Sequence, residues 1–175
     1  MRGLALAVCA CAALPMAWGA EKEPQPPSLG ARMPEFMHFD VAYRPHRLSD
    51  VQEPVLVLNF FAFWCDTWID ELPQLRELAA QQDDLGFKLL SITVDGAWTD
   101  QLDQVCGEEG VPFPVLVDRD SVLSASLGLR HIPTIMVLDG QRTVRFVYEA
   151  FPGKLVLLHG IRSALSARAS STRSE

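Results

Sequence analysis

The sequence predicts an α/β fold in which helices flank a mixed central β-sheet, and three observations carry this prediction. Residues 55–61 are a continuous apolar run after Pro54, as expected for a strand that is buried on both faces of a sheet. Apolar residues then recur at helical spacing over residues 66–82. Further along, Asp139-Gly140 separates two apolar runs and predicts a two-residue antiparallel hairpin. Strands joined both through helices and by a hairpin give a mixed sheet.

The other elements follow the same alternation. Residues 87–94 predict a strand that ends at Asp95-Gly96, and a helix over residues 99–109 should end at Gly110. Later patterns predict a strand over 113–117, a helix over 121–127, antiparallel strands over 134–138 and 143–148, and a helix over 155–165. The chain contains no internal repeat, so these elements belong to one domain.

The composition is that of an acidic globular protein. Of 175 residues, 49% are hydrophobic and 21% are charged, and 15 Lys and Arg oppose 22 Asp and Glu for a net charge of -7. This balance leaves no basic surface to neutralise phosphates, so we expect no nucleic-acid partner. The four histidines and four cysteines show no metal-ligand spacing, and we therefore expect no metal and no cofactor.

The N-terminal region predicts export. Arg2 precedes an apolar stretch over residues 4–14, and small residues follow up to Gly19, which is the pattern of a secretory signal peptide over residues 1–19. The stretch is too short to span a bilayer, so cleavage after Gly19 would leave a periplasmic or otherwise exported protein. The alternative is a lipoprotein in which acylated Cys11 anchors the chain, and only then do we expect membrane contact.

Proline content and polarity set the domain boundaries. Residues 20–34 are rich in proline and predict an extended tether, residues 35–165 form the domain, and residues 166–175 predict a disordered tail. Removal of the signal peptide leaves only Cys65 and Cys106. Outside the reducing cytosol, such thiols become disulfides or catalysts of disulfide exchange.

Cys65 is the candidate nucleophile. It stands where the strand over 55–61 turns into the helix over 66–82, and reaction sites in α/β folds gather at the carboxyl ends of strands. A cysteine in the first turn of a helix lies at the positive end of the helix dipole. That position favours thiolate over thiol, although the neighbouring Asp66 opposes the effect.

Residues 59–75, Asn-Phe-Phe-Ala-Phe-Trp-Cys-Asp-Thr-Trp-Ile-Asp-Glu-Leu-Pro-Gln-Leu, resemble the active-site strand and helix of thioredoxin-like proteins of the TlpA type. That family carries Trp-Cys-x-x-Cys, then a glutamate and a proline at the offsets of Glu71 and Pro73. The resemblance continues through residues 110–118 to Ile132-Pro133-Thr134, the family's cis-proline loop. It implies a thioredoxin-like three-layer sandwich and an exported thiol-disulfide oxidoreductase.

One departure from the family motif changes the chemistry. The second cysteine is absent, because Trp68 occupies its position. A dithiol enzyme forms a mixed disulfide through its first cysteine and is released when its second cysteine attacks that bond. Cys65 can perform only the first step, so an external thiol must resolve the adduct. The partners we expect are exported client proteins that carry cysteines or mixed disulfides, and a low-molecular-weight thiol.

The resemblance implies further roles around the thiol. Glu71 would pass protons beneath it, or else is a half-buried structural carboxylate. A cis Ile132–Pro133 bond would offer the backbone edge of Ile132 to an extended substrate, unless Pro133 merely opens a strand. Trp64 and Trp68 would form an apolar platform for a client. Alternatively, Trp68 simply fills the space of the missing cysteine.

Cys106 and His131 are weaker candidates. Cys106 should lie roughly 10 Å along its helix from the active edge of the sheet. Pairing with Cys65 would require local unfolding, so we expect a small buried apolar residue. His131 either tunes the thiolate near neutral pH or is simply solvated.

Three functions remain open. The leading hypothesis is thiol-disulfide exchange on exported proteins through Cys65 alone. The second is a non-catalytic binding or assembly factor that grips a partner with the surface of Trp64, Trp68 and Ile132. The third is a peroxidase of the related peroxiredoxin type, against which Ala62 stands where a threonine is expected.

Overall fold

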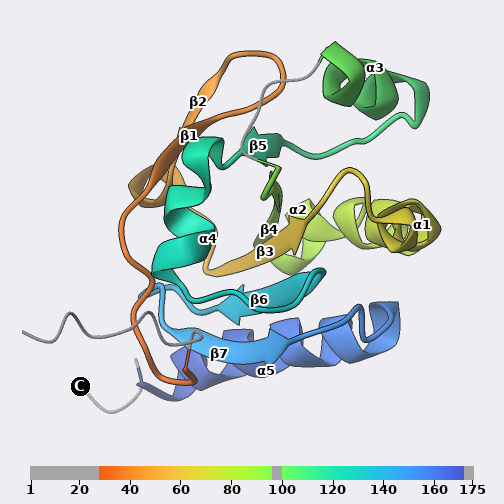
Figure 1. Cartoon of the computed structure of the whole chain (residues 1–175). Helices are drawn as coiled ribbons and strands as arrows, with labels where there is room; N and C mark the ends of the chain where they lie inside the picture. Colours follow the sequence, from red (N-terminus) through yellow and green to blue (C-terminus); the bar gives the residue numbers. More distant parts are fainter. Residues whose placement is uncertain (1–27, 96–99, 172–175) are drawn as a thin grey trace, which may run out of the picture.

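A mixed five-stranded sheet forms the centre of the protein (Figure 1). The structure is a computed structural model that describes residues 28–95 and 100–171. Its central strands are β3 (Val55–Phe61), β4 (Phe87–Thr93), β5 (Val115–Val117), β6 (Thr134–Leu138) and β7 (Val144–Tyr148). They lie in the order β5-β4-β3-β6-β7, and β3 pairs parallel to β4 and antiparallel to β6. The predicted mixed sheet is therefore confirmed.

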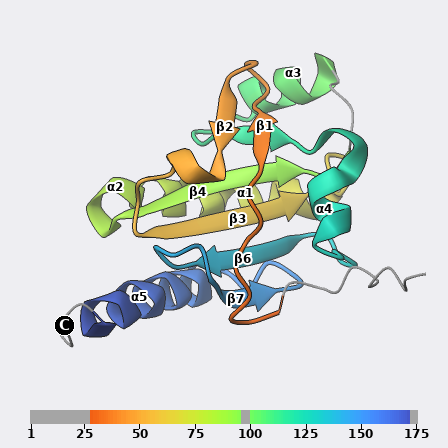
Figure 2. The ribbon, with the colours of Figure 1, turned by 90° about the vertical axis from the view of Figure 1, so that its left-hand side faces the viewer.

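Helices and a small hairpin cover the two faces of this sheet. One face carries α1 (Asp66–Ala79), α3 (Asp100–Glu108) and α5 (Lys154–Ser171), with the short α2 (Gln82–Leu85) at the start of β4. The opposite face carries α4 (Val122–Ser126) and the hairpin of β1 (Met37–Phe39) and β2 (Pro45–Arg47) (Figure 2). Single 3-10 turns, η1 (Leu48–Asp50) and η2 (Arg119–Ser121), complete the chain. The expected three-layer sandwich is thus confirmed.

Strand β3 supplies both hydrophobic cores because its side chains alternate between the two faces. Val55, Val57 and Phe61 enter the core beneath α1, α3 and α5. The residues at 56, 58 and 60 enter the core that α4 covers. Every residue of β3 is buried. A strand in this position reads as one unbroken apolar run, which is why it was the strongest feature of the sequence.

Several elements differ from the sequence-based expectation. The helix predicted over 66–82 ends at Ala79, and α2 is a separate turn. The β6–β7 connection is longer than a two-residue hairpin, since Arg142 N–H donates to Asp139 O and Asp139 N–H donates to Thr143 O. Arg142, at φ 61°, makes the left-handed step of this turn. The β1–β2 hairpin was not predicted, because three-residue strands carry too little periodicity to detect.

The domain begins earlier than residue 35. Gly30 N–H donates to Val144 O and Met33 N–H donates to Arg142 O, so this segment pairs with the start of β7. Met33 is 4% exposed and belongs to the core beneath α4. The tether prediction is therefore wrong for residues 28–34, because an extended chain can also serve as an edge partner for a sheet. Residues 1–27, with the predicted signal peptide and Cys11, lie outside the described residues.

Helix α5 extends past the predicted end of the domain. It continues to Ser171, whereas a disordered tail was expected from residue 166. Alanine and arginine are strong helix formers, so a stretch of low hydrophobicity can still prolong a helix that packs through Leu157, Ile161 and Ala164. Residues 172–175 lie outside the described part of the chain. Within that part, no helix is long and apolar enough to cross a bilayer.

Gly107 and Gly110 should respond in opposite directions to alanine. Gly107 lies inside α3 with open space where a Cβ would sit, so Gly107→Ala should raise the free energy of unfolding by about 0.5 kcal/mol through helix propensity. Gly110 follows α3 at φ 58°, so Gly110→Ala should lower it by about 1 kcal/mol. Urea unfolding followed by circular dichroism measures both. A loss of stability in Gly107→Ala would contradict the open packing of α3.

Candidate thiol site

Cys65 lies at the junction of β3 and α1, as the sequence predicts. It is the N-cap residue of α1, with φ -90° and ψ 106°, and its side chain is partly exposed. Its N–H donates to Ala62 O at 3.0 Å, which closes a four-residue turn, and Trp68 N–H donates to Cys65 O at 3.0 Å. The sulfur is therefore held at the N-terminus of α1, where it is partly accessible to solvent.

A hydroxyl group next to the sulfur was not predicted. Cys65 Sγ and Thr67 Oγ1 are 3.0 Å apart, a hydrogen-bond distance for sulfur. Either atom can be the donor in this contact, which gives the sulfur a side-chain partner at the start of α1. The only signal for this contact in the sequence is a threonine two residues after an N-cap cysteine, a spacing that side-chain N-cap bonds often use.

Trp68 is buried, so its predicted place on an exposed client platform is wrong. It is 1% exposed and stacks on Phe61, with ring centroids 4.4 Å apart and an interplanar angle of 14°. Its side chain extends beneath α1 into the core, because a residue at this position on the helix faces the sheet. The alternative was that Trp68 fills the space of the missing cysteine. Its burial agrees with this alternative, because a core side chain occupies that position.

Other predicted residues around the thiol have different exposures. Trp64 is 72% exposed and Ile69, on α1, is 40% exposed. Ile132 is half-buried and Pro133 is buried, and the bond between them is cis, as the resemblance implied. The exposed apolar surface next to the thiol therefore consists of Trp64 and Ile69, with Trp68 behind it.

Glu71 lies within α1, six residues after Cys65 and so roughly 9 Å along the helix axis. It is 6% exposed. Burial raises the pKa of Glu71 to about 7, and the neighbouring charge of Asp70 adds to the shift. Among the described residues, neither Glu71 Oε2 nor Trp68 Nε1 has a hydrogen-bond partner. A carboxyl group with this pKa can both accept and donate a proton near neutral pH.

Cys106 and His131 do not join the site. Cys106, 8% exposed in α3, packs in the core, and burial with the charge of Asp103 raises its pKa to about 11. A thiol of this kind is protonated and unreactive near neutral pH. His131 is exposed, and its Nε2 lies 3.9 Å from Glu149 Oε2. Its ion-pair partner is thus a surface carboxylate.

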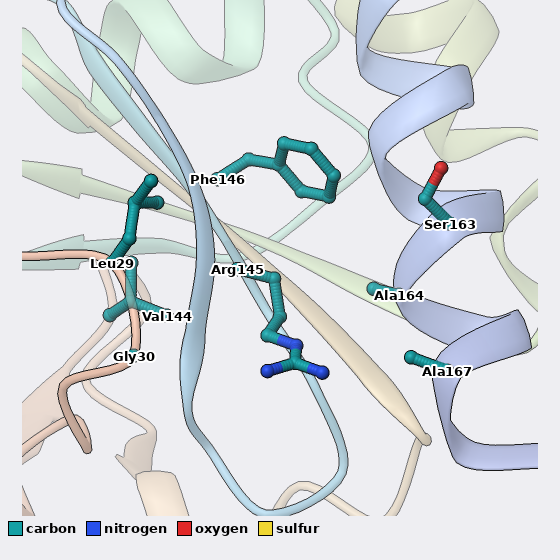
Figure 3. Close-up of a pocket in the computed structure, with 8 residues that line it drawn as sticks. All are labelled: Leu29, Gly30, Val144, Arg145, Phe146, Ser163, Ala164 and Ala167. Carbon is teal, nitrogen blue, oxygen red and sulfur yellow. The ribbon is translucent and has the colours of Figure 1, made fainter. Parts of the chain in front are cut away.

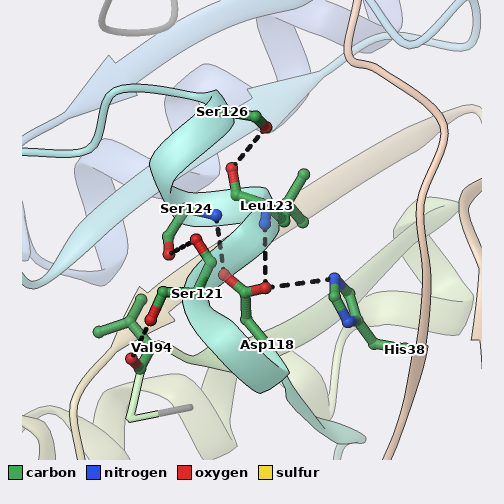
Figure 4. Close-up of polar contacts among 7 residues, drawn as sticks. All are labelled: His38, Val94, Asp118, Ser121, Leu123, Ser124 and Ser126. Carbon is green, nitrogen blue, oxygen red and sulfur yellow. Dashed lines mark hydrogen bonds and ion pairs between the residues drawn. The ribbon is translucent and has the colours of Figure 1, made fainter. Parts of the chain in front are cut away.

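A second buried carboxylate lies at the carboxyl end of β5. Asp118 is fully buried and accepts hydrogen bonds from the backbone N–H groups of Leu123 (3.0 Å) and Ser124 (2.7 Å) (Figure 4). His38 Nε2 lies 3.8 Å from Asp118 Oδ1. Burial lowers the pKa of His38, and the charge of Asp118 opposes this. Asp118 therefore fixes the start of α4.

A groove between β7 and α5 lies apart from the thiol. Its lining is Leu29, Gly30, Val144, Arg145, Phe146, Ser163, Ala164 and Ala167 (Figure 3). Arg145 is the charged group of this lining, and its Nε lies 3.4 Å from Asp139 Oδ2. No predicted site residue lines the groove. Within the described residues, no three His, Cys, Asp or Glu side chains are grouped to hold a metal ion.

A comparison with known protein families identifies the family to which this chain belongs. A family model described as the AhpC/TSA family matches residues 29–147. The chain belongs to the AhpC/TSA family. The matched range contains every residue of the thiol site, from Trp64 to Pro133, and stops before α5. Among curated AhpC/TSA-like relatives, the thiol-disulfide oxidoreductase ResA of Geobacillus thermodenitrificans (strain NG80-2) is 27% identical over 118 residues, which cover 67% of each chain.

Solved structures show the same fold as this AhpC/TSA family member. A putative thiol:disulfide interchange protein DsbE from Chlorobium tepidum superposes with a TM-score of 0.70 at 22% identity, covering 79% of this chain and 98% of its own. The exposed lipoprotein thioredoxin Etrx1 of Streptococcus pneumoniae strain TIGR4 gives a TM-score of 0.67 at 24% identity, covering 74% and 99%. These likenesses establish the thioredoxin fold.

Glu71 should make the stability of the protein depend on pH. Its pKa is raised from 4.5 to about 7 in the folded state, so between these values the folded state holds a proton that the unfolded state has released. Stability therefore falls as pH rises through this window, by about 3 kcal/mol. Glu71→Gln should remove most of this decline, as measured by urea unfolding at pH 4.5, 6 and 8.

The exposed Asp83 provides the matched control for this measurement. Asp83→Asn removes one carboxylate from the surface and should retain the wild-type decline. An unchanged pH dependence in Glu71→Gln would show that the carboxyl group is ionised in the folded protein.

Proposed function

We propose that the protein is an exported thioredoxin-like protein of the TlpA type that exchanges thiols and disulfides through Cys65 alone. The observation that carries this proposal is a partly exposed sulfur at the N-terminus of α1, 3.0 Å from a hydroxyl, with a buried tryptophan where a resolving thiol would stand. The ResA relatives, described as thiol-disulfide oxidoreductases, support the same chemistry. The first half of a dithiol reaction is retained, and the second half falls to a partner.

The reaction is an exchange that balances without a further oxidant. The Cys65 thiolate attacks one sulfur of a client's disulfide or mixed disulfide, a new S–S bond forms, and the other sulfur leaves as a thiolate. An external thiolate then attacks the sulfur of the group bound to Cys65, forms a disulfide with that group, and releases the Cys65 thiolate. With glutathione-type thiols, the net result is isomerisation or removal of an adduct from the client.

The surrounding residues support distinct parts of this exchange. Glu71, with its pKa of about 7, is the proton carrier for the leaving and entering thiols. The cis bond before Pro133 sets the backbone of Ile132 for an extended client segment. Trp64, 72% exposed, provides the apolar contact for that segment.

The N-terminal sequence motivates the proposal of export. A signal peptide ending at Gly19 would deliver the protein to the periplasm or outside the cell, and acylation at Cys11 would instead anchor it to a membrane. Such compartments contain client proteins with disulfides and lack the reducing systems of the cytosol.

A second candidate is a binding factor without catalysis. The exposure of Trp64 beside Ile69 favours it, because a large exposed tryptophan is a frequent anchor of protein interfaces. In that case Cys65 would be dispensable for partner binding. The following experiment distinguishes the two functions.

Cys65 should form mixed disulfides faster than Cys106 does. We expect the purified protein, incubated with a glutathionylated cysteine peptide, to form a covalent peptide adduct at Cys65, resolved by mass spectrometry of the digested protein. Cys65→Ser should form no adduct at this position. Cys106→Ser should behave as wild type, because the buried thiol is unreactive. Added glutathione should release the adduct. If Cys65 reacts no faster than a free cysteine, the exchange proposal fails and the binding factor remains.

Trp68→Cys should restore a dithiol at a cost in stability. The introduced thiol lies one helical turn from Cys65, within the span of a disulfide. The lost stacking on Phe61 leaves a cavity, so the free energy of unfolding should fall by about 3 kcal/mol. Reduction of insulin in the presence of dithiothreitol should accelerate. Trp68→Ala creates a similar cavity without a thiol and should remain inactive. Equal activity in both variants would contradict the proposal that Trp68 stands at the position of the resolving thiol.

A further inference from the structure

Asp95 connects the turn of Cys65 to the neighbouring strand. Asp95 Oδ2 accepts a hydrogen bond from Phe63 N–H at 2.7 Å and another from Thr93 Oγ1 at 2.5 Å. Phe63 lies two residues before Cys65, whereas Asp95 follows the end of β4. One carboxylate oxygen therefore links two segments that are 32 residues apart in the sequence.

The geometry of the turn makes this contact necessary. The bond from Cys65 N–H to Ala62 O closes the turn from Ala62 to Cys65, and the turn supplies no acceptor for Phe63 N–H. Phe63 is half-buried, and a backbone donor in such a place needs an acceptor from elsewhere in the protein or from solvent. The Asp95 carboxylate satisfies this donor, and an ionised acceptor makes a stronger bond than a neutral one.

Asp95 is itself held by a rigid part of the sheet. Val94 N–H donates to Phe61 O at 2.9 Å, which continues the β3–β4 ladder beyond the strands. Ser121 Oγ donates to Val94 O at 3.2 Å and connects the same point to η2 (Figure 4). The carboxylate that holds Phe63 thus projects from the residue directly after Val94, whose N–H and C=O are both hydrogen-bonded.

We propose that Asp95 is a positioning residue for thiol-disulfide exchange, acting through Phe63 N–H to fix the turn that presents Cys65. The inference rests on the proposed function, and it adds a residue outside the Trp-Cys motif and the cis-proline loop. Exchange requires the attacking sulfur to lie in line with the client's S–S bond. A turn held at one end only by its internal hydrogen bond would present that sulfur over a range of orientations.

A positioning role and a purely electrostatic role of Asp95 predict opposite changes in the rate of adduct formation at Cys65. Removal of a carboxylate near a thiol favours the thiolate and should by itself accelerate the reaction. Loss of a fixed turn slows it, because fewer encounters have the attacking geometry. A slower Asp95→Ala variant therefore identifies positioning.

The test compares Asp95→Ala, Asp95→Asn and Thr93→Val with wild type. We measure the rate of adduct formation at Cys65 with the glutathionylated peptide, the amide hydrogen exchange of Phe63, and the thermal unfolding midpoint. Asp95→Ala should be about tenfold slower, with faster exchange at Phe63. Asp95→Asn keeps an acceptor oxygen and should restore a rate near wild type. Thr93→Val removes the hydroxyl that donates to Asp95 Oδ2 and accepts from Asp95 N–H, but it leaves the bond from Phe63 N–H, so it should also react at a rate near wild type.

Each outcome decides the proposal. A rate in Asp95→Ala equal to or above wild type, unchanged exchange at Phe63, or an Asp95→Asn variant as slow as Asp95→Ala overturns it. If wild type forms no adduct, the proposed function fails, and the exchange at Phe63 alone decides whether Asp95 fixes the turn. Should Asp95→Ala not fold, Asp95→Ser, whose shorter side chain cannot reach Phe63, replaces it in the same measurements.

Discussion

The burial of β3 on both faces is the constraint on which the rest of the structure depends. A strand with apolar side chains on both sides requires a layer of chain over each, and the two hydrophobic cores follow from this requirement. The parallel bond to β4 then brings the ends of both strands to one edge of the sheet. The turn that leads to Cys65 meets Asp95 there through Phe63 N–H, because both segments follow directly after their strands. The site is a consequence of the packing of the central strand.

At the carboxyl end of β3, neighbouring residues in the first turn of α1 serve different purposes. Trp68 packs its ring in the core against Phe61, whereas Cys65 is partly exposed and Thr67 is exposed. A cysteine at the position of Trp68 would contribute little to the core, whereas the tryptophan contributes one of the largest fully buried side chains. The same core that gains this packing lacks a resolving thiol. One turn of the helix thus serves the core at Trp68 and leaves the sulfur of Cys65 partly exposed.

The sequence predicts the parts of this protein that depend on local pattern. The buried strand, the helix after it, the position of Cys65 and the core location of Cys106 all follow from apolar spacing and helix termini. The resemblance to a known family adds the cis bond before Pro133. Contacts between distant segments do not follow, because nothing near Phe63 in the sequence indicates that Asp95 accepts its N–H. The sequence left the place of Trp68 open for a similar reason: it allowed either an exposed platform or a filled space, and the stacking on Phe61 decides between them.

The burial of Cys106 has a consequence for stoichiometry. Its protonated thiol is withheld in the core beneath α3, so the described part of the chain offers a single reactive sulfur. A protein with two reactive thiols can form an internal disulfide or bridge two molecules, whereas this domain can form one disulfide at a time with another molecule. Under the proposed exchange, the domain would capture one client at a time and would return to its starting state only when another molecule supplies a thiolate. The concentration of that second molecule, rather than the fold, would then set how long each capture lasts.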